Sequence, residues 1–165
     1  MVDVMSRNRA VVTLPTDTQI MIERDFAAPK HLVYKALTTP ELVSKWWVGQ
    51  RGEMTLCEID LRVGGRWRNV MIAHGKFEVA FHGEYREIVH NERLVSTEVY
   101  EAIPDADAHP TVNTVTLTQL GDRTKLRTLV QCESKAQRDA IINSGMEGGM
   151  QEAFDLLEEI AISLR

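Results

Sequence analysis

The chain has 165 residues, which is enough for one domain with its own hydrophobic core. Nineteen Lys and Arg against 24 Asp and Glu give a formal net charge of −5. An acidic chain without a basic block is a poor candidate for binding nucleic acid, since phosphate binding needs clustered cations. No apolar run approaches the roughly 20 residues that span a bilayer, and no signal-peptide stretch opens the chain. We therefore expect a cytoplasmic protein that binds neither nucleic acid nor membrane.

The beginning of the chain predicts a flexible arm over residues 1–17, in which a short strand over 10–14 is the alternative. Residues 18–165 are expected to form a single domain. Alternating hydrophobicity over 19–26 predicts its first strand, with Arg24 on the same face as the apolar residues.

Two short helices are expected next. Pro29 and Pro40 are each well placed in the first turn of a helix, and the second helix should end near Trp46 and Trp47. Adjacent helical residues cannot share a face. One tryptophan is therefore expected in the core and the other at a rim, unless both pack against a sheet edge.

Turn residues then separate about six short runs with alternating hydrophobicity, which predicts antiparallel strands. Met54, Leu56 and Glu58 are expected on one face of the first of these strands. The cleanest alternation lies around Phe81, where one face is dry and the other wet. The dry face of the sheet is expected to carry Trp67, Met71, Phe77, Phe81 and Tyr85.

The period changes at the C-terminus. Ser134 can cap a helix, which weakens near Gly145, and an apolar stripe from Met146 to Leu164 predicts a long amphipathic helix. A one-sided sheet and such a helix must cover each other, or both would expose apolar surface. The sequence therefore predicts an α+β fold in which a curved antiparallel sheet wraps around the C-terminal helix.

Several short segments occur in an order and spacing typical of one family. They are Phe26-Ala27-Ala28-Pro29, Pro40-Glu41-Leu42, Trp46-Trp47, Gly64-Gly65-Arg66-Trp67-Arg68, Gly83-Glu84-Tyr85 and Ser144-Gly145-Met146. With them, the chain from Gln19 to Leu164 resembles the AHSA1-like family (activator of Hsp90 ATPase homologue) of the START-like, or SRPBCC, superfamily. The resemblance implies a helix-grip fold with a cavity between sheet and helix. Its relatives bind lipids, hormones or polyketide-like compounds, and a few catalyse cyclisation or hydrolysis.

Three functions follow from this resemblance and from the motifs. The first is a binding protein for a small apolar or amphipathic ligand, without a cofactor. The second is a cyclase or hydratase-type enzyme, in which Glu98, Tyr85 and Tyr100 move protons in the same cavity. The third is a co-chaperone or protein-interaction domain. Hsp90 interaction is not expected, because the family's namesake uses an additional N-terminal domain for which residues 1–17 leave no room. Edge strands could pair two copies into a homodimer.

The candidate site is the cavity between the dry sheet face and the start of the C-terminal helix. Its expected ligand-binding residues are Trp46, Trp47, Trp67, Asn69, Met71, Phe81, Tyr85, Glu98, Tyr100, Met146, Met150 and Phe154. For each of them the alternative is a filled core. An interior Glu98 would have a raised pKa, whereas the alternative is a solvated or Arg-paired carboxylate.

Three further observations bear on the cavity. Gly145, Gly148 and Gly149 weaken the start of the helix, which indicates close approach, a bend or empty space. Cys57 and Cys132 are expected to be buried and inert. The five histidines show no metal-ligand spacing, so no metal is expected.

Overall fold

The structure is a computed structural model and describes residues 9–165. Eight strands form one antiparallel sheet in the order β1-β2-β8-β7-β6-β5-β4-β3. The strands are β1 (Val11–Thr13), β2 (Gln19–Phe26), β3 (Gly52–Ile59), β4 (Arg66–Ala73), β5 (Phe77–Val89), β6 (Arg93–Tyr100), β7 (Thr111–Leu120) and β8 (Arg123–Gln131). The helices are α2 (Lys30–Thr38), α3 (Pro40–Trp46), α4 (Lys135–Asn143) and α5 (Met146–Ser163), with a short 3-10 helix, η1 (Ala106–Ala108).

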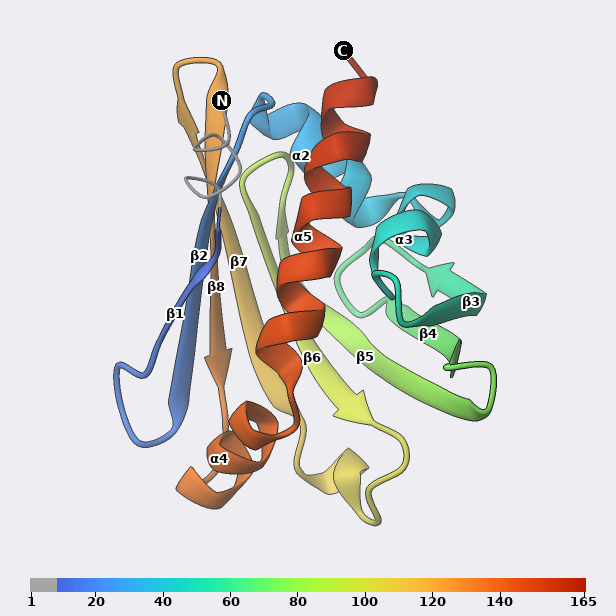
Figure 1. Cartoon of the computed structure of the whole chain (residues 1–165). Coiled ribbons are helices and arrows are strands. Elements are labelled where there is room, and N and C mark those ends of the chain that lie inside the picture. Colours follow the sequence, from blue (N-terminus) through green and yellow to red (C-terminus); the bar gives the residue numbers. More distant parts are fainter. Residues whose placement is uncertain (1–8) are drawn as a thin grey trace.

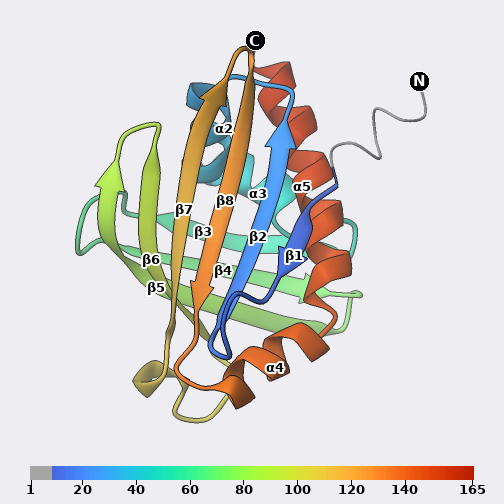
Figure 2. The ribbon, with the colours of Figure 1, turned by 90° about the vertical axis from the view of Figure 1, so that its left-hand side faces the viewer.

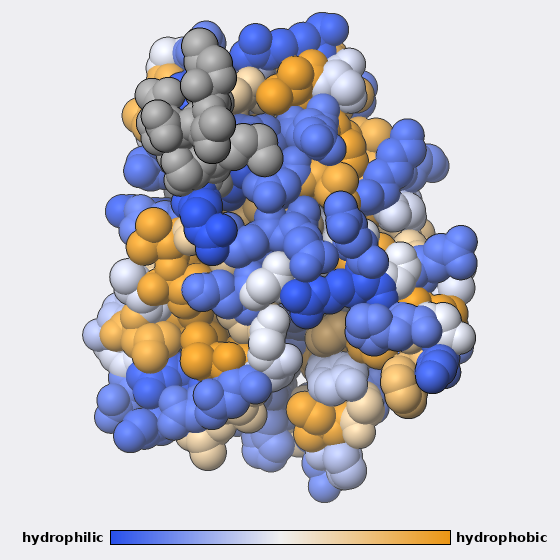
Figure 3. All heavy atoms as spheres, in the orientation of Figure 1, coloured by the Kyte–Doolittle hydropathy of each residue, from blue (hydrophilic) through white to orange (hydrophobic). Residues whose placement is uncertain are grey.

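The sheet curves strongly and α5 lies along its concave side (Figure 1). Seen from the side, β2, β8 and β7 run along the molecule while β3, β4 and β5 cross them (Figure 2). The outer side of α5 carries mostly hydrophilic side chains, so its apolar stripe faces inward (Figure 3). The predicted α+β arrangement, a sheet wrapped around a C-terminal helix, is confirmed.

The C-terminal half of α5 packs tightly, and we call this region the packed half. Leu157 and Ala161 have 0% exposure, and Phe154 meets Phe26 of β2 edge-to-face at 5.6 Å between ring centroids. Arg24 is buried beside them, where its guanidinium lies 2.7 Å from Asp155 and is held over the Phe26 ring. A buried charge is tolerated there because it is paired. The backbone of α5 also runs beside α2 and α3.

The predicted breaks in the chain are also present. The Ser134 hydroxyl accepts a hydrogen bond from the Gln137 backbone N–H at 3.0 Å, which caps α4. Gly145 has a φ of +83°, a left-handed conformation that suits glycine, and it separates α4 from α5. Within residues 9–165, no helix combines the length and hydrophobicity that a bilayer crossing requires.

Residues 1–8 of the predicted arm lie outside the described residues. In the rest of the arm, β1 pairs antiparallel with β2, which confirms the alternative of a short strand over 10–14. The backbone N–H and carbonyl of Ala10 bond the side chain of Gln151 at 3.0 and 2.8 Å, so this strand also contacts α5.

Two local predictions are wrong. A register shift between Met54 and Leu56 puts Met54 opposite Met71, on the face of Cys57 rather than on that of Leu56. Phe77 is not part of a dry face, since it begins β5 at the margin of the sheet and is 63% exposed.

Candidate ligand-binding site

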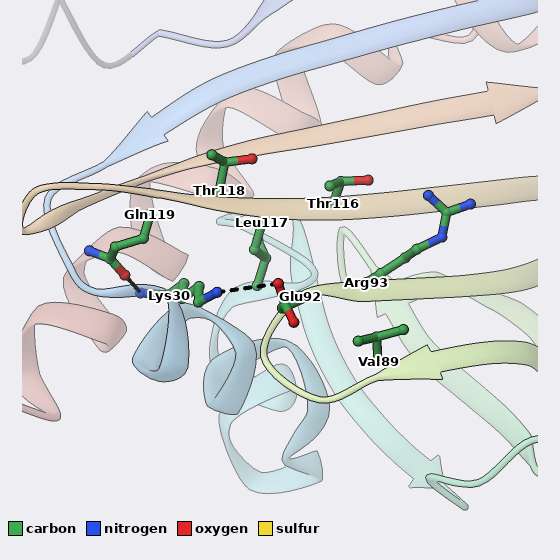
Figure 4. A pocket seen from close by; sticks show the side chains of 8 residues that line it. All are labelled: Lys30, Val89, Glu92, Arg93, Thr116, Leu117, Thr118 and Gln119. Atoms are coloured by element: carbon green, nitrogen blue, oxygen red, sulfur yellow. Dashed lines mark hydrogen bonds and ion pairs between the residues drawn. The ribbon is translucent and has the colours of Figure 1, made fainter.

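Two recesses open on the outside of the described structure, and neither is the predicted cavity. The first has a volume of about 510 Å³ and lies where α2 begins beside β7 and the β5–β6 turn (Figure 4). Its polar groups pair with each other: Lys30 Nζ lies 3.6 Å from Glu92, and the Lys30 backbone N–H donates to Gln119 at 2.8 Å. These groups already have partners and offer little to a ligand.

The second recess, of about 460 Å³, lies on the convex face of β4, β5 and β6. Arg68 binds Glu101 through two bonds of 2.8 Å, and His82 lies 2.8 Å from Glu101 and 2.7 Å from Asp107. Bonds to Arg68 and then His82 hold the pKa of Glu101 at about 2. Of the predicted site residues, only Trp67 borders this recess.

The strand registers bring the predicted sheet residues to the concave face. Asn69 of β4 lies opposite Phe81 of β5, which in turn lies opposite Tyr100 of β6. Tyr85 lies opposite Ser96. From Ser96 the same face continues through Asn113 and Val130 to Ile20 of β2. Ile20 shares a face with Phe26, which packs on α5, so all these side chains face the helix.

In front of the first turns of α5, the facing side chains remain partly accessible. We call this region the open half of the concave face. Trp67, Met71, Phe81, Ser96, Glu98, Asn113, Met146 and Met150 are all half-buried there. These side chains are half-buried although they face the interior of the fold, and Trp67, Met146 and Met150 pack against the edge of the hydrophobic core.

Polar groups in the open half lack partners. Asn69 is 5% exposed, and its Oδ1 is buried with no hydrogen-bond partner within residues 9–165. The hydroxyl of Tyr85, which is 7% exposed, makes no hydrogen bond to any described residue. Burial raises the pKa of Tyr85, and the nearby Cys57 and Tyr34 add to the rise. Buried polar groups are nearly always paired with protein or ordered water. Unpaired buried atoms also occur in the packed half, where Nε and Nη1 of Arg24 have no hydrogen-bond partner among the described residues.

Glu98 is the charged residue of this face. Its Oε1 accepts a bond of 2.7 Å from Asn113 Nδ2, while Oε2 makes no hydrogen bond within the described chain. Burial raises the pKa of Glu98, and the bond from Asn113 lowers it in part. No Lys or Arg of residues 9–165 pairs with it, so the expected alternative of an Arg-paired glutamate is wrong.

Trp67 forms part of the floor of the open half. Its indole Nε1–H donates to the Thr97 carbonyl at 3.2 Å, so the ring crosses β5 from β4 to β6. Gly83 lies beneath it, and a Cβ there would collide with both the indole and the Thr97 carbonyl. Glycine at this position lets the tryptophan lie flat against the sheet.

Three aromatic rings line one end of the open half. Trp47 meets Phe81 edge-to-face at 5.3 Å, and Phe81 stacks on Tyr100 at 5.0 Å. Tyr100 is 37% exposed, which places this row at the margin of the concave face. Trp46 is instead 7% exposed and bonds the Ala36 carbonyl, so the tryptophan pair divides between core and rim. Trp46 and Phe154 thus lie apart from the open half.

The loop after α3 closes against the first turns of α5. Arg51 binds Glu152 through Nε and Nη2, each at 3.3 Å from Oε2. A Cβ on Gly148 would lie 2.8 Å from Arg51 Nη2, and Gly149 also faces this guanidinium. Of the explanations offered for these glycines, close approach therefore applies to Gly148, whose neighbour is the flexible end of the Arg51 side chain, whereas the contacts of Gly149 are ordinary.

Some residues near the site were not foreseen. Asn113 follows from the alternation of β7, but its bond to Glu98 depends on the pairing of β6 with β7. Tyr34 of α2 lies near Tyr85. Cys57 is half-buried opposite Asn69, and burial, the largest cause, raises its pKa. A raised pKa makes a thiol less reactive, whether fully buried or not.

The inward side chains of the open half are mostly apolar, with a few polar groups among them. In the part of the chain that the structure describes, no three His, Cys, Asp or Glu side chains are placed to share a metal ion. Burial raises the pKa of Glu98 and the hydrogen bond from Asn113 lowers it in part. What remains is an apolar wall carrying a few polar groups, the usual composition of a small-molecule site.

Comparisons with known proteins agree with this fold. A solved structure from Rhodobacter sphaeroides superposes with a TM-score of 0.86 at 24% identity, over 94% of this chain and 99% of that one. A protein of Nitrosomonas europaea gives 0.80 at 24% identity, over 92% and 98% of the two chains. An AHSA1-like protein from Aeromonas hydrophila gives 0.64 at 21% identity, over 88% and 93%.

Among curated proteins, no match to the chain is found. Residues 27–161 match the profile of a family described as "Activator of Hsp90 ATPase homolog 1-like protein". Because this match covers most of the chain and the fold agrees with it, the protein belongs to the activator of Hsp90 ATPase homolog 1-like family.

Proposed function

We propose that the protein binds a small hydrophobic or amphipathic molecule between the open half of the concave face and the first turns of α5. The observation that carries the proposal is the set of inward-facing groups beside the first turns of α5. Met146 and Met150 are half-buried there, as Leu156 and Ile160 are further along the helix, but only here do they share the interior with the buried, unpaired Asn69 Oδ1 and the Glu98 carboxylate.

The side chains of the open half are better suited to contact an apolar ligand than water alone. Met71, Met146 and Met150 are unbranched and adaptable, which suits a guest of irregular shape. The ring row of Trp47, Phe81 and Tyr100 offers flat apolar surface at the margin. A cyclase or hydratase function would use Glu98, Tyr85 and Tyr100, and within the described structure no hydrogen bond joins any two of these three side chains.

A binding titration with a neutral apolar fluorophore, N-phenyl-1-naphthylamine, tests the proposal. We expect saturable binding with one molecule per chain. Met150→Trp, which adds volume to the open half, should weaken binding about tenfold or more. Ile162→Trp, on the 43% exposed outer side of α5, is the matched control and should leave binding unchanged.

Native mass spectrometry of gently purified protein adds a second readout. A bound molecule with a mass of a few hundred daltons, displaced by the fluorophore, would support the proposal. Absence of saturable binding, or equal effects of the two tryptophan substitutions, would contradict it.

A further inference from the structure

The charge of the concave face is one-sided. Across the inward positions of β3 to β8, the strand registers place one ionisable carboxylate, Glu98, and no Lys or Arg. Two arginines contact α5. Arg24 lies in the packed half and is paired with Asp155 and Glu158, and Arg51 lies against Gly148 and Gly149 and is paired with Glu152.

Among the described residues, a carboxylate oxygen is the one charged group left without a hydrogen bond in the open half, beside neutral groups that include the Asn69 amide N–H donors. The amide of Asn113 is already donating to Glu98 Oε1, while Glu98 Oε2 and Asn69 Oδ1 accept no bond from the described residues. The hydroxyls of Tyr85 and Ser96 are neutral and can donate or accept, so they do not offset the carboxylate.

These two features discriminate between guests with the same tail. A carboxylate head group would enter without a counter-charge and would meet Glu98, which is costly away from water. An amine or hydroxyl would instead supply the donor that Glu98 and Asn69 lack. Bonds from a donor to a charged acceptor are the stronger class of hydrogen bond.

We infer that the guest of this site is an amphipathic molecule whose polar group donates hydrogen bonds, an amine or an alcohol, and not a fatty acid or another carboxylate. The inference rests on the proposed function, since it concerns the same site. In this site Glu98 accepts the hydrogen bond from the polar group of the ligand, and Asn113 orients the Glu98 carboxylate.

The test is displacement of N-phenyl-1-naphthylamine by three ten-carbon compounds, decylamine, 1-decanol and decanoate, below their micelle concentrations. In the unmodified protein we expect decylamine and decanol to displace the fluorophore at least about tenfold more effectively than decanoate, a difference of one charged hydrogen bond. This ranking needs no variant, so it remains decisive even if a substitution impairs folding.

Glu98→Gln then assigns the preference. It should reduce the affinity for decylamine about tenfold and change the affinity for decanol by no more than about threefold. The difference in affinity between decylamine and decanoate should become smaller. Glu159→Gln removes the same charge from the exposed side of α5 and should change none of the three affinities.

The outcomes separate the two proposals. If the fluorophore itself does not bind, the proposed function fails. If it binds and decanoate displaces it as well as decylamine does, the proposed function stands and this inference is overturned. A preference for the amine that survives Glu98→Gln would likewise overturn the role of Glu98.

Discussion

The two ends of α5 meet the same sheet in different ways. In the packed half, Phe154 fits against Phe26 edge-to-face and Leu157 is sealed from solvent. In the open half, Met146 and Met150 face a floor of half-buried side chains and unpaired polar atoms. Both halves of the helix are tied to the rest of the fold, the first through Gln151 to Ala10 and Glu152 to Arg51, and the second through Asp155 to Arg24.

The largest expected effect is a loss of stability when a side chain of the packed half is shortened. Leu157→Ala should lower the free energy of unfolding by about 2–5 kcal/mol, the range for a fully buried leucine that leaves a cavity. Met150→Ala should cost only about 1 kcal/mol, because its side chain already borders accessible space. Urea unfolding of both variants measures the difference, and equal costs would contradict the distinction between the halves.

A smaller effect is expected in the open half, where Glu98 makes the stability of the fold depend on pH. Burial raises the pKa of Glu98, so the folded state holds this proton more tightly than the unfolded chain. Ionised Glu98 therefore costs stability, and the cost grows as pH rises from the ordinary value of 4.5 through the raised pKa.

Glu98→Gln removes that cost. We expect the variant to be more stable than the parent near pH 8, with the gain vanishing toward about pH 4, where the carboxyl is protonated in both states. Urea unfolding across pH measures it. A variant that is less stable at about pH 8 would show that the carboxylate is well solvated or paired.

The smallest effect concerns the convex face, where the polar groups are paired. Burial, the largest single influence, lowers the pKa of His82, but the bonds and charges of Glu101 and Asp107 outweigh it and the net pKa is raised. His82 therefore stabilises the fold fully below its ordinary value of 6.5, and this contribution is lost as pH rises through the raised pKa.

His82→Gln should therefore cost about 0.5 kcal/mol at about pH 6 and less at about pH 9, since the cluster is partly exposed. Thermal unfolding at the two pH values measures the change. A cost that grows with pH would mean that the bonds to Glu101 and Asp107 do not hold a charged imidazole.

Much of the fold was predictable because it follows local patterns. Alternation placed Phe81 and Tyr85 on one face, and Ser134 capped its helix as expected. The errors have local causes that a regular pattern cannot show. A register shift moved Met54 to the other face, and Phe77 lies where the sheet ends.

The site was less predictable than the fold. The partner of Glu98 depends on which residue of β7 lies beside it, and the proximity of Tyr34 to Tyr85 depends on how α2 docks. Free space depends on the volumes of side chains from distant segments. The sequence around Met150 therefore does not reveal whether the side chains of the facing strands pack against it. Alternating hydrophobicity identified which strand residues face inward, and tertiary packing decides how closely other side chains cover them.

The most direct test of an unfilled interface is a methyl NMR titration. Protein labelled with 13C at the methionine methyl groups is titrated with N-phenyl-1-naphthylamine. We predict saturating shifts at Met71, Met146 and Met150, which line the open half, and none at Met21, which points to the other face of β2. Unchanged signals from the first three, or equal shifts at Met21, would contradict the account.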